Sequence, residues 1–235
     1  MKIHDILAAV QIDEGPNDPH IFKAVFLSGG PGSGKSFVAN KLLKGTGLKT
    51  VNSDDVYEFL ATQNDVDLGN PDEVYSDKGQ ELRMKAKALT DKRRGNADKG
   101  DDGYIGGRLG LIIDGTGKDV NSVKDLKTKL QNLGYDTMML FVNTDLEVAQ
   151  QRNQKRQRRL PAEQVSKMWH RVQQNLMKFQ QVFGAANFHI VDNSGGLEDP
   201  ERAEQFKQVD KNIRAFLSQK PQNRVAKQWL DNNTR

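Results

Sequence analysis

The stretch Gly29-Gly30-Pro31-Gly32-Ser33-Gly34-Lys35-Ser36 decides the fold of this chain. It matches the pattern G-x-x-x-x-G-K-[ST] in full. Glycines let backbone N–H groups turn toward phosphate oxygens, and a helix that begins near Gly34 adds the positive end of its dipole. In such a loop Lys35 reaches the β- and γ-phosphates of ATP, and the Ser36 hydroxyl ligates Mg²⁺. The stretch therefore predicts an ATP·Mg²⁺ site.

The segments on either side of this loop provide the context that the motif requires. Ala24-Val25-Phe26-Leu27 is a continuous apolar run, the signature of a strand buried on both faces. Residues 35–43 follow as a helix with an apolar face. A glycine-rich turn with an accidental Lys-Ser is the alternative, and it would not account for a strand before the loop and a helix after it.

The same alternation continues along the chain. Further strands are expected at 50–52, 111–113, 137–142 and 188–191. Amphipathic helices are expected at 55–61, 119–133, 162–183 and 200–217. Buried strands that alternate with such helices predict an α/β protein with a five-stranded, mostly parallel sheet flanked by helices, which is the P-loop NTPase fold in its nucleotide-kinase form.

Three segments are expected along the chain. They are an N-terminal extension at 1–20, a P-loop kinase domain at 21–218 and a polar C-terminal tail at 219–235. The extension contains one short amphipathic helix and ends in turn-forming residues. In the frayed, polar tail, Trp229 and Leu230 are apolar enough to dock on the domain.

An insertion at 62–107 interrupts the alternation within the domain. It holds an expected helix at 73–90 and a polar, Gly- and Asp-rich tip at 95–107. Insertions of this length usually act as lids or bind substrate. It also carries a basic group: Arg83, Lys85, Lys87, Lys92, Arg93 and Arg94. Such a group is commonly a solvated helix face, whereas a functional one would hold an anionic substrate such as a phosphorylated sugar nucleotide or a polynucleotide end.

The composition excludes several classes of site. With no cysteine in 235 residues, the chain has no disulfide, no Cys-based zinc site and no thiol nucleophile. Its four histidines lack the spacing of metal ligands. The net charge of +4 mildly favours an anionic partner, which ATP alone satisfies. No apolar run approaches the roughly 18 residues that span a bilayer, and no clear export cleavage site is found, so we expect a cytoplasmic protein without membrane contact.

Acidic residues follow two of the expected strands. Asp54 and Asp55 follow the second strand, and Asp114 follows the third. Ligands of a parallel sheet bind beyond the carboxyl ends of its strands, so these carboxylates should face the γ-phosphate. Asp54 suits the base that prepares an acceptor hydroxyl, and Asp114 suits either this task or anchoring Mg²⁺. The alternatives are a helix N-cap for Asp54 and a turn aspartate before Gly115 for Asp114.

A basic segment precedes the long helix expected at 162–183. Arg152-Asn153-Gln154-Lys155-Arg156-Gln157-Arg158-Arg159 places five cations in eight residues before Leu160-Pro161 interrupts the chain. A segment of this kind between two helices is typical of a lid whose arginines neutralise charge on a transferring phosphoryl group. A solvated basic face or a nucleic-acid patch is the alternative.

Four of these segments resemble zeta-toxin-type kinases and the kinase domain of phage polynucleotide 5′-kinases. They are residues 29–36, 52–55, 113–118 and 130–137. The resemblance covers about residues 22–192. In both families a carboxylate just after the second strand activates the acceptor hydroxyl, which implies Asp54 as the base here.

The resemblance also implies roles for residues further along the chain. In zeta toxins an acidic-Gly-Thr-Gly-Arg segment handles substrate, which implies this role for Asp114, Thr116 and, with Lys in place of Arg, Lys118. The Arg-Asn-x-Lys-Arg lid of the polynucleotide kinases is matched from Arg152 to Arg156, which implies Arg152 at the nucleotide and Arg156 at the transition state.

This chain departs from its relatives at two places. Tyr57 stands where they carry an arginine three residues after the base, and the insertion at 62–107 is longer than that of the zeta toxins. The acceptor therefore stays open among a sugar nucleotide, a nucleoside and a polynucleotide 5′ end.

We predict an ATP-dependent phosphotransferase that moves the γ-phosphate to a hydroxyl acceptor, with zeta toxins or polynucleotide kinases as its nearest type. A nucleoside or nucleotide kinase is the enzymatic alternative. An ATP-binding switch or assembly protein that hydrolyses ATP slowly is the alternative outside the kinases, and the fold alone does not separate them.

Overall fold

The centre of the computed structural model is a five-stranded sheet, in a chain described at residues 17–156, 158–195 and 198–233. Its strand order is β2-β3-β1-β4-β5, and each of the four neighbouring pairs is parallel. The strands are β1 Lys23–Ser28, β2 Lys49–Val51, β3 Leu111–Gly115, β4 Asp136–Asn143 and β5 Phe188–Asp192. The predicted α/β P-loop NTPase fold is confirmed.

The central strand β1 is buried on both faces. Its side chains alternate, so that Ala24 and Phe26 enter one apolar core and Val25 and Leu27 enter another. A parallel sheet covered on both sides requires this continuous apolar sequence, which explains why the strand can be recognised directly before the glycine-rich loop.

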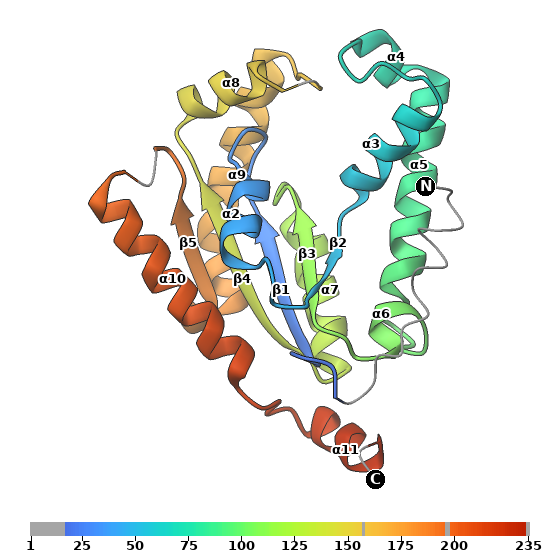
Figure 1. The fold of residues 1–235 in the computed structure, drawn as a ribbon, viewed down its shortest axis with the longest axis vertical. Helices are drawn as coiled ribbons and strands as arrows, with labels where there is room; N and C mark the ends of the chain where they lie inside the picture. Colours follow the sequence, from blue (N-terminus) through green and yellow to red (C-terminus); the bar gives the residue numbers. More distant parts are fainter. Residues whose placement is uncertain (1–16, 157, 196–197, 234–235) are drawn as a thin grey trace.

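Helices cover the two faces of the sheet, as Figure 1 shows. Two helices pack on the side of Val25: α2 Lys35–Leu42 and α10 Pro200–Ser218. Two others pack on the side of Phe26: α7 Val120–Asn132 and α9 Ala162–Phe183. The shorter elements α8 Leu146–Gln154 and η1 Ala185–Asn187 lie on either side of α9 in sequence. The helix expected at 162–183 is confirmed with these bounds.

The insertion between β2 and β3 forms a helical unit beside the sheet (Figure 1). It comprises α3 Ser53–Gln63, α4 Pro71–Tyr75, α5 Asp77–Arg94 and α6 Gly103–Gly106. The prediction of one helix at 73–90 is wrong, because the chain is extended at Ser76 and the Ser76 hydroxyl accepts the Gly79 N–H to start α5. A separate apolar core joins α3, α4 and α5, with Tyr57, Leu60 and Leu82 among its residues.

The tip expected to be polar at 95–107 is partly buried. Tyr104 and Ile105 of α6 enter the same core as Phe26. The Gly- and Asp-rich sequence around them forms the turns that let this short helix reach the core, because Gly95, Gly100 and Gly103 all have positive φ. The tip is therefore an anchor of the insertion.

Helix α11 Arg224–Asn233, at the C-terminal end of the described chain, lies beneath the sheet in Figure 1. Instead of fraying, the predicted tail contains this helix, whose Ala226 is buried. The Trp229 ring lies 5.4 Å from the ring of Phe22 in an edge-to-face arrangement. The apolar residues of this segment share one face of the helix, and that face is covered by packing against Phe22. The short helix predicted within 1–20 falls largely on residues 1–16, outside the described ones.

Over the described part of the chain, none of the helices combines the length and the apolarity of a membrane span.

Replacing Trp229 with alanine should lower the free energy of unfolding by about 1–3 kcal/mol, because a half-buried aromatic contact with Phe22 is lost. Val225→Ala is the matched control on the same helix, since 43% of the Val225 side chain is exposed, and it should change stability by less than about 0.5 kcal/mol. Urea denaturation measures both variants. Equal stability of the two would show that α11 does not depend on this contact.

Candidate active site

The glycine-rich loop connects the carboxyl end of β1 to the start of α2. Gly34 has a positive φ of 81° and stands at the N-cap of the helix. The partly buried Lys35 side chain turns back over the loop, and its Nζ donates a hydrogen bond of 2.9 Å to the Gly29 carbonyl. The ammonium group is thus held over the backbone that the sequence motif assigns to phosphate binding.

Neighbouring atoms close in on the loop so tightly that Gly29, Gly32 and Gly34 have no room for a side chain. A Cβ on Gly32 would collide with the backbone of Ala149 in α8, and one on Gly34 would collide with the Asn193 amide. Asn193 also donates a hydrogen bond of 2.8 Å from its Nδ2 to the Ser33 carbonyl. The conformation of the loop is therefore supported from the ends of β4 and β5.

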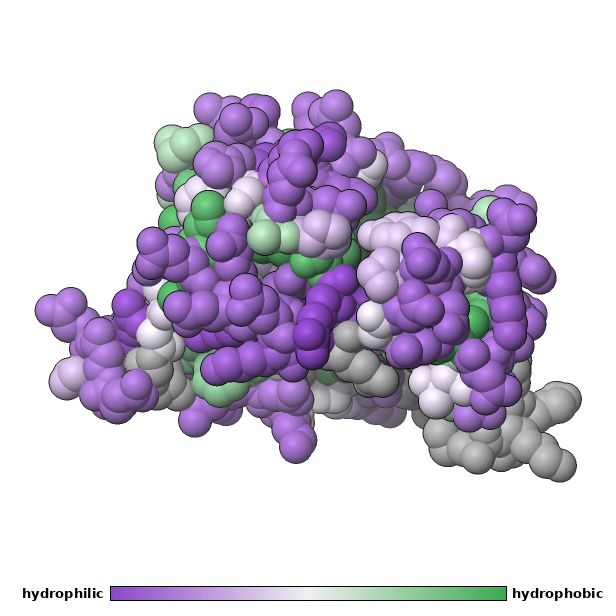
Figure 2. Space-filling model, turned by 90° about the horizontal axis from the view of Figure 1, so that it is seen from above, coloured by the Kyte–Doolittle hydropathy of each residue, from purple (hydrophilic) through white to green (hydrophobic). Residues whose placement is uncertain are grey.

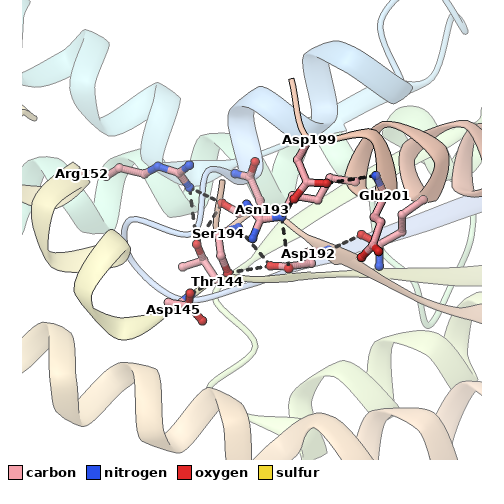
Figure 3. Close-up of polar contacts among 10 residues, drawn as sticks. Thr144, Asp145, Arg152, Asp192, Asn193, Ser194, Asp199 and Glu201 are labelled. Atoms are coloured by element: carbon pink, nitrogen blue, oxygen red, sulfur yellow. Dashed lines mark hydrogen bonds and ion pairs between the residues drawn. The ribbon is translucent and has the colours of Figure 1, made fainter. Parts of the chain in front are cut away.

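A network of polar residues at the ends of β4 and β5 places Arg152 beside the loop (Figure 3). Arg152 Nη1 donates a hydrogen bond of 2.6 Å to the Asn193 carbonyl, which also accepts one from the Thr144 hydroxyl at 3.0 Å. Ser194 joins the network, with its hydroxyl donating to Asp192 at 2.6 Å and accepting the Asp145 N–H. The predicted nucleotide residue Arg152 is therefore adjacent to the phosphate loop.

Asp114 lies at the carboxyl end of β3, directly across from Leu27 of β1. Its Oδ2 accepts a hydrogen bond of 3.1 Å from Asn52 Nδ2, while its Oδ1 is buried without a partner among the described residues. Burial raises the pKa of Asp114 to about 6, which Lys35 opposes and the carboxylates of Asp55 and Asp54 reinforce. A buried carboxylate oxygen without a donor is costly, so it points to a missing ligand.

The pKa of Lys35 moves in the opposite sense. Burial lowers it, the Asp114 carboxylate opposes this change, the Arg156 guanidinium lowers it further, and Asp54 raises it. The structure therefore places Asp114, Asp54 and Arg156, which the sequence predicts for catalysis, within electrostatic reach of Lys35.

Asp54 is exposed at the start of α3, with 65% of its side chain accessible. The cap of this helix is Asn52, whose side chain accepts the Asp54 N–H at 2.9 Å, so the Asp54 carboxylate does not serve as the N-cap. Across the cleft, Arg158 Nη1 approaches Asp54 Oδ1 at 3.5 Å. The carboxylate is free of capping and faces the basic segment.

The remaining predicted residues lie on the edges of this group. Thr116 is partly buried and Lys118 is exposed, on a loop held by a hydrogen bond of 2.9 Å from Asn175 Nδ2 to the Gly117 carbonyl. Arg156, which belongs to the group, is exposed just after the end of α8. Figure 2, which looks onto the carboxyl ends of the strands, shows that hydrophilic side chains dominate this face.

The protein oxygens at this site suit a Mg²⁺ ion that is also bound by the phosphates of the nucleotide. In the described ranges, no group of three or more His, Asp or Glu side chains could hold a metal. Mg²⁺ commonly uses one or two protein oxygens and completes its shell with water and phosphate oxygens. The unpartnered Oδ1 of Asp114 and the exposed Ser36 hydroxyl suit this mode.

Several residues of the site are absent from the sequence prediction. Asn52 holds Asp114, Asn193 holds the phosphate loop, and Arg158 rather than Arg156 contacts Asp54. Asn193 follows an expected strand, and this position at the edge of the sheet is the signal that could have identified it.

Comparison with known proteins agrees with this geometry. The AAA domain family (AAA_33) matches residues 25–176, which is more than half of the chain. The chain belongs to this family. The matched residues include β1 from Val25 onward, the phosphate loop, both carboxylate positions and the segment 152–159.

Individual relatives match this member of the AAA domain family less completely. A cytidylate kinase of Ignicoccus hospitalis is 41% identical over 73 residues, which are 31% of this chain and 42% of that enzyme. The match therefore spans less than half the length of this curated relative. The PezAT chromosomal toxin-antitoxin system of Streptococcus pneumoniae gives a TM-score of 0.53 at 13% identity, covering 92% of this chain and 93% of that one. The structure of AvrRxo1-ORF1:-ORF2 with ATP gives a TM-score of 0.50 at 14% sequence identity. The match covers 92% of this chain and 86% of that one. These structures share the fold.

Replacing Asp114 with asparagine should change how stability depends on pH, in the absence of nucleotide and metal. The folded pKa of about 6 exceeds an unfolded value of about 4. The proton therefore stabilises the fold fully below pH ~4, and this contribution is lost as the pH rises through 6. Asparagine does not titrate and has no such loss. As the pH rises from 4 to 8, the free energy of unfolding of the variant should therefore increase, relative to that of the parent, by at most about 2–3 kcal/mol. Urea denaturation at several pH values measures the difference.

Asp119→Asn is the control for this experiment. Hydrogen bonds from Ser122 lower the pKa of Asp119, so its linkage has the opposite sign, and asparagine there should bring no gain as the pH rises. A pH profile of Asp114→Asn that is parallel to that of the parent would contradict the raised pKa.

Proposed function

We propose that this protein is an ATP-dependent phosphotransferase that moves the γ-phosphate of ATP to a hydroxyl acceptor. The observation that carries this proposal is that Asp114, Asp54 and Arg156 all lie within electrostatic reach of Lys35 in the phosphate loop. A nucleotide-binding switch needs the loop and a metal anchor. A second carboxylate facing a mobile acceptor, with arginine opposite, is what transfer to a hydroxyl requires.

Each residue has a separate task in this mechanism. Backbone N–H groups of residues 29–34 and the Lys35 ammonium bind the β- and γ-phosphates. Asp54 orients the acceptor hydroxyl and accepts its proton as the oxygen attacks phosphorus. Arg156 and Arg152 stabilise the negative charge of the transferring group and of the departing ADP. Thr116 and Lys118 would contact the acceptor from the loop after β3.

Ser36 and Asp114 would hold Mg²⁺ together with the phosphates. When bound, the ion supplies positive charge that neutralises the β- and γ-phosphate oxygens. It would also give Asp114 Oδ1 the partner that it lacks among the described side chains. The likeness to a fold solved with ATP supports the choice of nucleotide.

We propose the chemical class of the acceptor, a compound with a free hydroxyl group, and three such classes have support. The resemblance of the sequence to zeta toxins supports a sugar nucleotide acceptor, and the basic lid supports a polynucleotide 5′ end. The match to a cytidylate kinase favours a second candidate, a nucleoside or nucleotide kinase. Incubation with γ-labelled ATP and 5′-OH oligonucleotides, nucleosides, nucleotides or UDP-sugars separates these acceptors.

The Lys35→Ala variant serves as the negative control for this panel, because it removes the ammonium from the phosphate loop. It should retain the fold and lose label transfer to any acceptor. If the parent binds ATP and transfers label to none of the acceptors, the ATP-binding switch or assembly protein becomes the better proposal.

Asp54→Asn should bind ATP normally, melt within a few degrees of the parent and lose about 10²–10⁴-fold in turnover. Asparagine keeps the shape of the side chain and loses the base, while Asn52 still caps α3. Glu58→Gln, one turn later on the same helix, is the matched control and should transfer label at the parental rate. Full activity of Asp54→Asn would leave Asp114 as the next candidate for the base.

Arg156→Ala should lower kcat by about 10³-fold with a much smaller effect on ATP affinity, since a lid arginine acts on charge that develops in the transition state. Lys155→Ala, an exposed neighbour, is the control. Measurements of kcat and of ATP binding separate the two effects. Normal turnover together with a salt-sensitive loss of oligonucleotide binding would instead assign the segment to nucleic-acid contact.

A further inference from the structure

Two arginines from distant parts of the chain lie close to the ring of Tyr57 in α3. The Arg83 guanidinium of α5 lies 5.0 Å from the centre of this ring, and that of Arg158 lies 5.2 Å from the same centre. The ring is 1% exposed. Cation–π contact with the ring offsets part of the repulsion between the two guanidinium groups, which explains how two cations can share one location.

Several hydrogen-bond donors at this cluster are buried and unused. Tyr57 Oη, Arg83 Nε and Arg83 Nη2 have no hydrogen-bond partner within the described part of the chain. Leaving such groups unpaired is costly, most of all for charged groups, so native proteins rarely do so without a ligand. The N–H groups of a guanidinium and the O–H of a phenol can donate hydrogen bonds to the same oxyanion.

The charge of the cluster agrees with an anionic ligand. Arg83 and Arg158 contribute two positive charges, and Asp54, 3.5 Å from Arg158, contributes one negative charge. The Asp54 side chain is largely exposed and that of Arg158 is partly exposed, so solvent screens this pair and it is weak. An oxyanion can therefore compete with Asp54 for Arg158.

We propose that Arg83, Arg158 and the Tyr57 hydroxyl form a binding site for an anionic group of the acceptor, a phosphate ester or a carboxylate. Arg158 must move to admit this group, and it then exchanges Asp54 for the new anion. The exchange releases the Asp54 carboxylate from its ion pair at the moment when the acceptor arrives. The acceptor part of this inference rests on the proposed phosphotransferase function, whereas the anion site itself does not.

The position of Tyr57 also limits the shape of the acceptor. It lies three residues after Asp54 on the same helix, which is about 4.5 Å along the helix axis. The hydroxyl to be phosphorylated and the recognised anion should therefore be a few bonds apart, as in a sugar phosphate or a nucleotide. This site takes the place of the single arginine that the resemblance leads one to expect at position 57.

Inorganic phosphate is the first probe, applied to the full chain saturated with Mg²⁺ and a non-hydrolysable ATP analogue so that the phosphate loop is occupied. Isothermal titration should detect phosphate binding by the parent. Arg83→Gln should bind about tenfold more weakly or worse, since charge-assisted hydrogen bonds are lost. Lys85→Ala, an exposed cation on the same helix, should bind like the parent. Equal binding by Arg83→Gln and the parent would overturn the proposal.

Tyr57→Phe keeps the experiment decisive even where Arg83→Gln folds poorly. It removes only a hydroxyl that is buried without a partner in the described structure, so the variant should be at least as stable as the parent. It should nevertheless bind phosphate more weakly. Unchanged phosphate affinity in a folded Tyr57→Phe variant would exclude the hydroxyl from the site.

Matched acceptors connect the site to turnover. Each hydroxyl compound is offered in three forms: neutral, carrying a phosphate and carrying a carboxylate. The anionic form that is preferred identifies the group, and Arg83→Gln should raise KM for it about tenfold while leaving KM for the neutral form unchanged. Equal use of all three forms by the parent would overturn the acceptor role. Phosphate binding without transfer to any acceptor would instead remove the proposed function and leave the anion site intact.

Discussion

The site depends on the electrostatic coupling between an ammonium and a carboxylate that are both partly withdrawn from water. Burial lowers the pKa of Lys35 and raises that of Asp114, and each charge opposes the loss of the other. Removing two charges from water costs more than one pair recovers unless further hydrogen bonds are made. Here Asp114 Oδ1 has no such bond to a described residue. The arrangement is therefore suited to a phosphate chain with its metal ion, which supplies the charges that the protein lacks.

The nucleotide side and the acceptor side of the site are built differently. The phosphate loop is fixed by backbone contacts with α8 and by Asn193, which is itself bound to the ends of β4 and β5. The proposed acceptor side is closed by Arg158, whose contacts with Tyr57 and Asp54 join the basic segment to α3. A preorganised loop costs no reorganisation when ATP binds, whereas a weak contact across the cleft lets the acceptor enter.

The insertion is the part of the fold in which local sequence patterns were least informative. The strands could be predicted because burial on both faces leaves uninterrupted apolar runs. The break between α4 and α5 could not, because amphipathic residues continue through it and one hydroxyl, that of Ser76, starts the second helix. Tyr104 and Ile105 were hidden in a polar context, since two apolar side chains within a glycine-rich turn have no periodicity to reveal their burial.

The amino-acid sequence by itself determined the phosphate loop, the parallel sheet and the carboxylates at the strand ends, because these depend on local patterns of glycine, apolar runs and strand order. Only the tertiary structure decided which side chains complete the site. Arg158 and Asp54 are 104 residues apart, and Asn193 reaches Ser33 across 160. Contacts of this kind follow from how helices pack on the sheet and leave no periodic trace. For this reason the arginine closest to Asp54 became evident only once α3, α5 and the basic segment were in place.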